Sequence, residues 1–347
     1  MSERIAVVLF NLGGPDSPEA VQPFLKNLFS DPAILRMPGL LRWLLGNFIA
    51  RTRAPVAREI YDKMGGRSPI VENTRAQAKS LLNRLSAIHQ DAEIECFIAM
   101  RYWAPMAEEV AEKVKAFNPD RIVLAPLYPQ FSSTTTASSF KSWDEAARDA
   151  GLDAPTARIC CYPDDSGFVS AVAGFVRAGI EQASASGTPR ILFSAHGLPE
   201  KFVQAGDPYQ YQVEKTVAAI VAEIGDDTLD FRICYQSRVG RLVWLGPYTD
   251  DEIIRAGSDG VPLVVVPVAF VSEHSETLVE LDMEYGDLAR ENGVPAYIRA
   301  PAVGTAPEFI DGLARLVGQA IERGNGILSG PGERICPSAC HDCLLTA

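Results

Sequence analysis

Two of the four histidines in this chain fall where they could act chemically together. His196 follows an apolar run that ends at Ser194, and His274 follows a second apolar run, in the sequence Glu273-His274-Ser275-Glu276. One such histidine alone more often makes a local hydrogen bond, but two at matching places favour a shared site. Imidazole and carboxylate groups bind divalent cations and exchange protons near neutral pH. The chemistry predicted here is metal binding combined with proton transfer.

Carboxylates continue after His274. Glu276, Glu280 and Glu284 recur every four residues, with Glu273 near the same stripe, so a helix would align them on one face. A solvated acidic face is the commoner meaning of such a run. Against it, like charges four residues apart destabilise a helix, and this segment starts directly after a buried strand. Two interpretations stay open: a solvated face, or a path that guides protons or a cation toward the histidine.

A cysteine cluster lies at the end of the sequence. Cys336, Cys340 and Cys343 fall within eight residues, a spacing that suits thiolate ligation of zinc or of an iron–sulfur cluster. A fourth ligand must come from elsewhere. The adjacent pair Cys160 and Cys161 is favoured over the remaining candidates, which are Cys96, Cys234 and, for zinc, His341.

These groups need a scaffold, and the hydrophobic pattern predicts an α/β fold. Short apolar runs alternate with helix-like stretches such as 106–117, 209–224 and 275–292, and continuous runs such as Val264–Val266 are typical of parallel strands buried on both faces. The predicted strands form two series of four, which indicates two similar halves: 5–10, 94–100, 122–126 and 157–162, then 190–194, 231–235, 262–270 and 296–299. Ligands should then bind in the cleft between the halves, at the carboxyl ends of the strands.

On this basis we predict that the chain divides into three segments. Residues 1–165 form the first half and 166–305 form the second half with the His/Glu site. Residues 306–347 form a terminal helix and the cysteine-rich tail, which we expect to pack back on the first half.

Aromatic and cationic residues follow several predicted strands. Arg101, Tyr102 and Trp103 follow the second strand, Tyr128 follows the third and leads into a hydroxyl-rich run from Ser132, and Trp244 lies beyond the sixth. Each aromatic taken singly is more often a core residue. Together around one cleft they suit a large flat ligand that carries carboxylates.

The segment 34–48 is unusually apolar yet carries Arg36 and Arg42 and is followed by Arg51 and Arg53. It is either a buried helix or an interfacial segment that dips into a membrane surface or covers a ligand entrance. Basic residues here, in an acidic chain, favour a surface that faces anionic lipid.

Composition limits the function classes. The formal charge of −12 argues against nucleic-acid binding. No apolar run of about 18 residues occurs, so we expect no membrane span. The seven unevenly placed cysteines do not form a secreted disulfide framework, and Met1–Arg4 runs straight into a strand-like segment without a secretory signal. We expect a cytoplasmic protein.

Taken in order, the motifs resemble the ferrochelatase family from about residue 5 to 343. They are Asn11-Leu12-Gly13-Gly14-Pro15, Gly65-Gly66-Arg67-Ser68-Pro69, Met100-Arg101-Tyr102, Leu127-Tyr128-Pro129-Gln130, Ser194-Ala195-His196-Gly197-Leu198-Pro199, Gln236-Ser237-Arg238-Val239-Gly240, Trp244-Leu245-Gly246-Pro247 and Glu273-His274-Ser275-Glu276-Thr277-Leu278.

The resemblance implies two Rossmann-like domains of the chelatase type, each with a four-stranded parallel sheet, and insertion of Fe²⁺ into protoporphyrin IX to give protohaem, the last step of haem biosynthesis. It implies that His196 and Glu276 are the catalytic pair and bind the Fe²⁺ substrate, beside an acidic path of Glu273, His274 and Glu280. The residues that it assigns to the porphyrin are Leu12, Arg101, Tyr102, Tyr128, Ser132 and Trp244.

The resemblance also concerns cofactors and partners. Many members carry a [2Fe-2S] cluster in the tail, here on Cys336, Cys340 and Cys343. Animal members take the fourth cysteine from the hydroxyl-rich loop, where this chain has Ser133, so the resemblance leaves the fourth ligand open between Cys161 and Cys160, the pair that the residue pattern favours. No ATP or nucleotide is needed, and no GxxxxGK[ST] motif occurs. The segment 34–48 matches the family's membrane-facing entrance, which implies peripheral association with the inner membrane. A homodimer, and contacts with the enzymes before and after it in the haem pathway, are further partner hypotheses.

The mechanism expected is proton removal coupled to metal entry. His196 would accept a pyrrole proton while the pocket holds the ring bent. Two alternatives are a chelatase for another tetrapyrrole or metal, such as coproporphyrin or cobalt, and a carrier of haem or metal without turnover.

Overall fold

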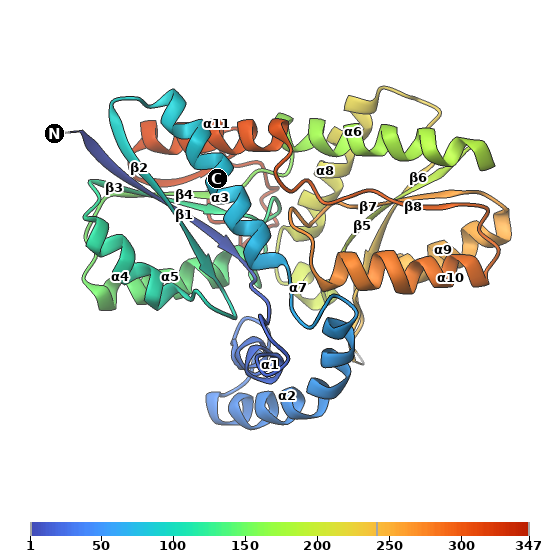
Figure 1. Ribbon diagram of the computed structural model, residues 1–347, viewed down its shortest axis with the longest axis horizontal. Helices are drawn as coiled ribbons and strands as arrows, with labels where there is room; N and C mark the ends of the chain where they lie inside the picture. Colours follow the sequence, from blue (N-terminus) through green and yellow to red (C-terminus); the bar gives the residue numbers. More distant parts are fainter. Residues whose placement is uncertain (1, 241, 346–347) are drawn as a thin grey trace. The chain divides into compact units, whose positions relative to one another are not determined.

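A computed structural model describes residues 2–240 and 242–345 of the chain, and these form two compact units (Figure 1). The first unit comprises Met1–Cys160 and Ala314–Leu328. The second comprises Cys161–Leu313 and Ser329–Ala347. Each unit is built around its own sheet.

The sheet of the first unit has the strand order β2-β1-β3-β4-β9. The interior strand β1 is buried almost throughout and pairs in parallel with β2 and β3, and β3 pairs in parallel with β4. In Figure 1, α3 and α11 cover one face of this sheet, and α4 and α5 cover the other. The strands are β1 (Glu3–Asn11), β2 (Ala92–Met100), β3 (Arg121–Pro126), β4 (Thr156–Cys161) and β9 (Gly326–Ser329), and the helices are α3 (Ile70–Ile88), α4 (Ala107–Phe117), α5 (Thr136–Ala150) and α11 (Pro307–Arg323).

The sheet of the second unit has the order β6-β5-β7-β8, all parallel. The helices α6 and α8 lie on one face, and α9 and α10 on the other (Figure 1). The strands are β5 (Arg190–His196), β6 (Phe231–Gln236), β7 (Leu263–Pro267) and β8 (Tyr297–Arg299). The helices are α6 (Ser166–Ala183), the 3₁₀ turn Ser184–Ser186, α7 (Glu200–Gln204), α8 (Tyr209–Ile224), α9 (Thr249–Asp259), the π-helix Glu276–Glu284 and α10 (Tyr285–Glu291).

The two orders confirm the predicted α/β fold with two similar halves, because β2-β1-β3-β4 and β6-β5-β7-β8 are the same arrangement. All eight predicted strands are present. Two details were not predicted. The short strand β9 gives the first sheet a fifth strand, and the helix predicted over 275–292 begins as a π-helix before it becomes α10. Its i→i+5 hydrogen bonds distort regular helix geometry, a distortion that is frequent at functional sites.

The cysteine tail differs from its expected place. Of residues 306–347, which we expected to pack back on the first half, Ala314–Leu328 belongs to the first unit, but the tail from Ser329 belongs to the second. Gln212 Nε2 donates to Cys336 Sγ at 3.1 Å, and the Asp342 N–H donates to the Gly206 carbonyl at 3.1 Å. Gly206, with φ of +103°, permits this approach, since a Cβ there would lie 2.8 Å from the His341 backbone nitrogen. The tail is therefore anchored on α8 and the α7–α8 loop.

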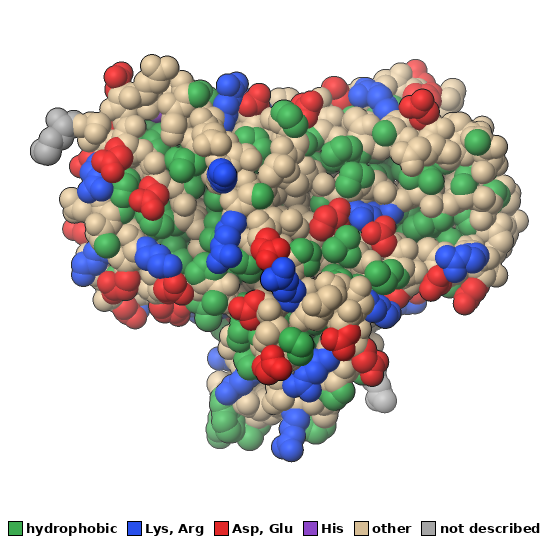
Figure 2. Space-filling view, in the orientation of Figure 1, with side chains coloured by type: hydrophobic (Ala, Val, Ile, Leu, Met, Phe, Trp, Pro, Cys, Tyr) green, Lys and Arg blue, Asp and Glu red, His purple; other side chains and the backbone are tan. Residues whose placement is uncertain are grey.

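A two-helix segment, α1 (Val21–Ser30) and α2 (Gly39–Asp62), follows β1. The helices pack on each other through an apolar cluster that includes Phe24, Ala54 and Tyr61. The outer face of α2 is exposed instead, with 73% of Leu40 and 65% of Phe48 accessible. The interpretation of 34–48 as a wholly buried helix is therefore wrong. Figure 2 shows apolar and basic side chains together on this segment, at the bottom of the view.

Among the described residues, no helix has both the length and the apolar character needed to cross a bilayer.

Candidate active site

His196 is the last residue of β5, and its ring has a fixed orientation. Nδ1 lies 2.6 Å from the Gly197 carbonyl oxygen, which can only accept, so Nδ1 carries the proton. This leaves Nε2 directed at the Glu276 carboxylate, with Oε1 at 3.4 Å. The side chain is only partly buried, at 38% exposed.

His274 approaches the same carboxylate from its other side. Its Nδ1 donates to the Ser272 carbonyl at 3.1 Å, and its Nε2 lies 3.3 Å from Glu276 Oε2. The Phe270 ring lies 4.6 Å from the His274 ring and 6.4 Å from that of His196, centroid to centroid. Glu276 therefore bridges two imidazoles whose Nε2 atoms both face it.

The electrostatics of the pair are strongly coupled. Burial lowers the pKa of His196, but the Glu276 charge, the hydrogen bond to it and the Gly197 carbonyl outweigh burial and raise the pKa to about 9. Burial likewise opposes ionisation of Glu276, but His196 and His274 hold its pKa well below its usual range. At neutral pH the site rests as an imidazolium–carboxylate ion pair.

Glu280 is the most heavily hydrogen-bonded carboxylate near this site. It accepts the Ser237 N–H at 2.8 Å, Gln236 Nε2 at 3.1 Å, the Tyr285 hydroxyl at 3.1 Å and the Ser237 hydroxyl. Burial and the Glu276 charge raise its pKa. Glu280 ties the π-helix to the end of β6, so its oxygens are engaged in structure.

Glu273 is directed elsewhere. Arg299 Nη1 donates to its Oε1 at 2.6 Å, and the Ala302 N–H donates to the same oxygen at 2.9 Å. Burial opposes ionisation, but Arg299 outweighs it and lowers the Glu273 pKa. Of the residues predicted for an acidic path, the structure joins His274 to Glu276 directly, while Glu273 and Glu280 are held by other partners.

The loop after His196 requires glycine. A Cβ on Gly197 would lie 2.8 Å from the Gln236 carbonyl and 3.1 Å from the Trp244 ring. Trp244 is half-buried, and its Nε1 donates to the Val239 carbonyl at 3.0 Å. Gly197 therefore lets the predicted porphyrin residue Trp244 pack directly beside the His196 loop.

In the first unit, the other predicted porphyrin residues gather at the carboxyl ends of β1, β2 and β3. The Arg101 N–H donates to the Asn11 carbonyl at 2.9 Å, and the Tyr102 N–H donates to the Leu12 carbonyl at 3.0 Å. Leu12 is half-buried, whereas Tyr128 is buried and its hydroxyl has no hydrogen-bond partner among the described residues. Ser132 is buried, with its hydroxyl 2.9 Å from that of Thr134.

Tyr102 stands apart because its side chain is fully buried. It belongs to the cluster that packs α1 on α2, and its hydroxyl donates to Asp31 Oδ2 at 2.8 Å. Sequence reasoning did not identify Asp31, since nothing local connects an aspartate at the end of α1 with residues about seventy positions later.

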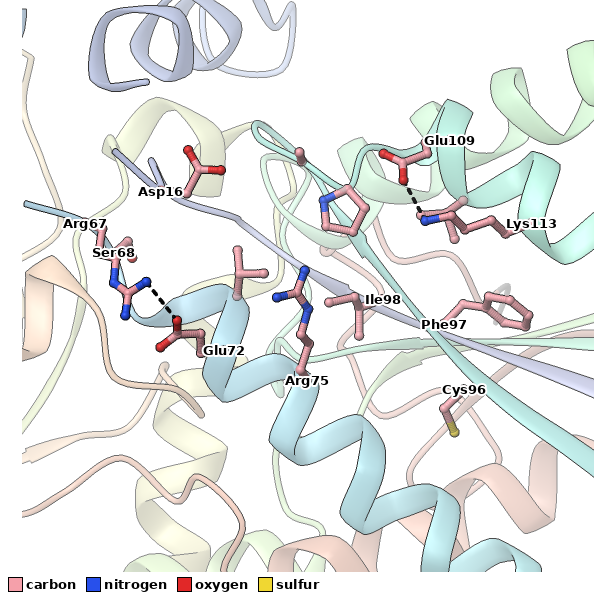
Figure 3. Close-up of a pocket in the computed structure, with 14 residues that line it drawn as sticks. Asp16, Arg67, Ser68, Glu72, Arg75, Cys96, Phe97, Ile98, Glu109 and Lys113 are labelled. Carbon is pink, nitrogen blue, oxygen red and sulfur yellow. Dashed lines mark hydrogen bonds and ion pairs between the residues drawn. The ribbon is translucent and has the colours of Figure 1, made fainter. Parts of the chain in front are cut away.

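A cavity of about 450 Å³ lies elsewhere in the first unit, between the start of α3, β2 and the first turns of α4 (Figure 3). Two ion pairs flank it: Arg67 with Glu72 at 3.2 Å, and Lys113 with Glu109 at 2.6 Å. Cys96, one of the less favoured candidates for the fourth tail ligand, lines it, but none of the other residues predicted to bind metal or porphyrin is among its described lining residues. Its lining gives no support to either role.

The tail cysteines fit an iron–sulfur cluster only in part. The Cys336 sulfur accepts an N–H from Gln212 at 3.1 Å. However, burial raises the pKa of Cys336 to about 12. No group of three or more His, Cys, Asp or Glu side chains in the described ranges is arranged to hold a metal ion. The geometry does not form the predicted ligand set.

Comparison with known proteins agrees with the resemblance. The sequence model of the family described as Ferrochelatase matches residues 4–321. Ferrochelatase of Phenylobacterium zucineum is 52% identical over 340 residues, covering 98% of this chain and 97% of that protein. Ferrochelatase of Caulobacter vibrioides strain NA1000 is 51% identical over 329 residues, covering 95% and 94%.

Among solved structures, SirB from Bacillus subtilis with Fe³⁺ aligns with a TM-score of 0.53 at 12% identity, covering 92% of this chain and 95% of that one. The sirohydrochlorin chelatase SirB from Bacillus subtilis subspecies spizizenii, in complex with cobalt, aligns with a TM-score of 0.50 at 13% identity, covering 93% and 95%. At this identity the likeness concerns the fold alone.

Proposed function

The chain belongs to the ferrochelatase family, and from that premise we propose that it inserts Fe²⁺ into protoporphyrin IX at His196 and Glu276 to form protohaem. The observation that carries the proposal is the Glu276 carboxylate, placed 3.4 Å and 3.3 Å from the Nε2 atoms of His196 and His274. Imidazole and carboxylate ligands suit Fe²⁺ and, unlike a thiolate set, can release it to the porphyrin.

Metal insertion must release two protons, since the free porphyrin carries two pyrrole N–H groups and the product carries none. In the resting site His196 already holds a proton, because Glu276 raises its pKa to about 9. We propose that Fe²⁺ arriving at Glu276 weakens this ion pair and drives the proton off His196. That proton leaves to solvent, and the neutral Nε2 then accepts the two pyrrole protons in turn, passing the first to solvent before it accepts the second. This order links base formation to the arrival of the metal.

The porphyrin contacts are proposed as follows. Arg101 meets a peripheral carboxylate of the ring, since its Nη1 has no hydrogen-bond partner among the described residues and its side chain is 18% exposed. Leu12, Tyr128 and Trp244 offer apolar or aromatic surface, and Ser132 supports the hydroxyl-rich loop. Tyr102 supports the pocket without touching the porphyrin, since its side chain is fully buried.

We further propose that α2 rests on an anionic membrane surface. Leu40, Trp43, Leu44 and Phe48 are each more than half exposed. Arg51 and Arg53 are exposed on the same helix. An apolar face flanked by arginines is the pattern of an interfacial helix at an anionic lipid surface.

The tail cluster is a separate proposal on which no catalytic step depends. It places a [2Fe-2S] cluster on Cys336, Cys340, Cys343 and either Cys160 or Cys161, and it is supported by the cysteine spacing and the Gln212 contact. Visible absorption and two iron atoms per chain after anaerobic purification are expected, and both should be lost in Cys340→Ser. A colourless, iron-free protein that is fully active would refute the cluster.

The proposed reaction is tested by anaerobic turnover. Fe²⁺ and protoporphyrin IX should yield the spectrum of protohaem catalytically, with coproporphyrin as the competing substrate. Faster metallation of coproporphyrin would show that coproporphyrin, and not protoporphyrin IX, is the preferred substrate. Tight haem binding without turnover would indicate a carrier.

A further inference from the structure

One oxygen of Asp31 is the meeting point of three side chains in the first unit. Asp31 Oδ2 accepts from Arg101 Nη2 at 2.7 Å, from the Tyr102 hydroxyl at 2.8 Å and from the Ser138 hydroxyl at 2.5 Å. Its other oxygen, Oδ1, accepts the Ala33 N–H at 2.8 Å. Asp31 is 4% exposed, so this carboxylate is an interior group with all its contacts supplied by the protein.

The arrangement fixes Arg101 at two of its three nitrogens. Nη2 binds Asp31, and Nε donates to the Ser138 hydroxyl at 2.7 Å, whose own proton goes to Asp31. Both anchors therefore depend on the one carboxylate. The remaining nitrogen, Nη1, has no hydrogen-bond partner in the described part of the chain.

A guanidinium held in this way has its free edge oriented before a ligand arrives. Arginine has a long, flexible stem, and its planar donors recognise a carboxylate well only when their direction is set. Ser138 is on α5 and Asp31 follows α1, so the orientation is transmitted from two helices to a residue at the end of β2.

We propose that Asp31 is a positioning residue that aims Arg101 at a carboxylate of the tetrapyrrole and so makes the protein prefer dicarboxylic porphyrins. The inference rests on the proposed function for the identity of the ligand. The Asp31 charge would repel a ligand carboxylate, but that charge is shared among three donors on one oxygen, which reduces the repulsion. Orientation is therefore the larger effect.

The test compares two ligands that differ only in their carboxylates. Protoporphyrin IX and its dimethyl ester are titrated in the same detergent against wild type, Asp31→Asn, Ser138→Ala and Asp144→Asn, and dissociation constants are measured by fluorescence. Asp144→Asn is the matched control, since Asp144 pairs with Arg158 at 2.7 Å in the same unit but lies outside this network.

We expect the wild type and Asp144→Asn to favour the diacid by the same factor. In Asp31→Asn the ratio of the dissociation constants of the dimethyl ester and the diacid should fall at least fivefold. In Ser138→Ala, which changes no charge, the same ratio should fall at least twofold. A loss of affinity that is equal for both ligands, or a preference unchanged or increased, would overturn the positioning role. If Asp31→Asn does not fold, Ser138→Ala decides by the same ratio.

Binding is measured without metal, so this experiment does not depend on turnover. A wild type that binds the diacid selectively but never metallates it would contradict the proposed reaction and leave the role of Asp31 supported. Active turnover by the wild type, with an unchanged preference for the diacid in the variants, would support the proposed reaction and contradict the positioning role of Asp31.

Discussion

Glu276 Oε1 lies 3.4 Å from Nε2 of His196, and the other oxygen of the same carboxylate lies 3.3 Å from Nε2 of His274. Both imidazoles direct their Nδ1 protons to backbone carbonyls, so neither ring can turn without losing that bond. The carboxylate is therefore held between two imidazole Nε2 atoms in a fixed arrangement.

The first prediction concerns the proton on His196. Replacing Glu276 by glutamine removes the negative charge that raises the His196 pKa, so that pKa should fall from about 9 toward its ordinary value of 6.5. NMR titration of histidine-labelled protein measures this directly. A wild-type His196 that titrates at or below 6.5 would contradict the ion pair.

The same pair predicts a dependence of stability on pH. The folded-state pKa of His196 lies above its ordinary value of 6.5, so its contribution to stability is complete below pH 6.5 and is lost as the pH rises through about 9. Urea unfolding between pH 6 and pH 9.5 should show this loss in wild type. Glu276→Gln should show less of it, and an identical slope in both proteins would count against the coupling.

The third prediction concerns Gly197. Gly197→Ala places a Cβ 2.8 Å from the Gln236 carbonyl, so we expect a loss of about 1–3 kcal/mol in the free energy of unfolding and a lower metallation rate. Gly174→Ala is the matched control. Apart from its own helix, no atom of the described residues lies within 4 Å of its Cβ position in α6, so the variant should be neutral or stabilise by about 0.5–1 kcal/mol. Equal behaviour of the two variants would show that the His196 loop is adaptable.

The fourth prediction concerns the exposed apolar face of α2. Replacing Trp43 and Phe48 by serine removes apolar surface worth about 1.5–3 kcal/mol per side chain when it is buried in lipid. Binding to vesicles that contain anionic lipid should therefore weaken more than tenfold, as measured by sedimentation. The control replaces Ile88 and Ile254, which are 51% and 42% exposed outside α2, by serine. Unchanged vesicle binding by the Trp43/Phe48 variant would refute the membrane surface.

The sequence predicted the elements better than the connections between them. Apolar runs such as Val264–Val266 identify buried strands, and His196 could be placed at a strand end because that is a local property. The ion pair of Glu273 with Arg299 and the contacts of Asp31 with Arg101 could not be predicted, since they join residues 26 and 70 positions apart. The π-helix was missed because a four-residue spacing of glutamates is equally compatible with an α-helix.

The hydrophobic pattern of the sequence also could not predict a very short strand or the direction of a buried side chain. The strand β9 has only four residues, too few for a periodicity to register. Tyr102 belongs to a motif that resembles porphyrin-binding sequences, yet its ring packs into the α1–α2 cluster. A motif indicates that a residue matters but not which way its side chain points.

The most direct test of the central claim is to measure metallation and porphyrin binding together in His196→Ala. We expect the rate of protohaem formation from Fe²⁺ and protoporphyrin IX to fall by at least about 10²–10⁴-fold, the range for loss of a positioned acid–base group. Porphyrin affinity should stay within about threefold of wild type, and the control His89→Gln, at a histidine of the first unit, should retain full activity. Near-normal metallation by His196→Ala, or lost porphyrin binding with a normal rate in the remaining complex, would contradict the assignment of His196 as the metallation base.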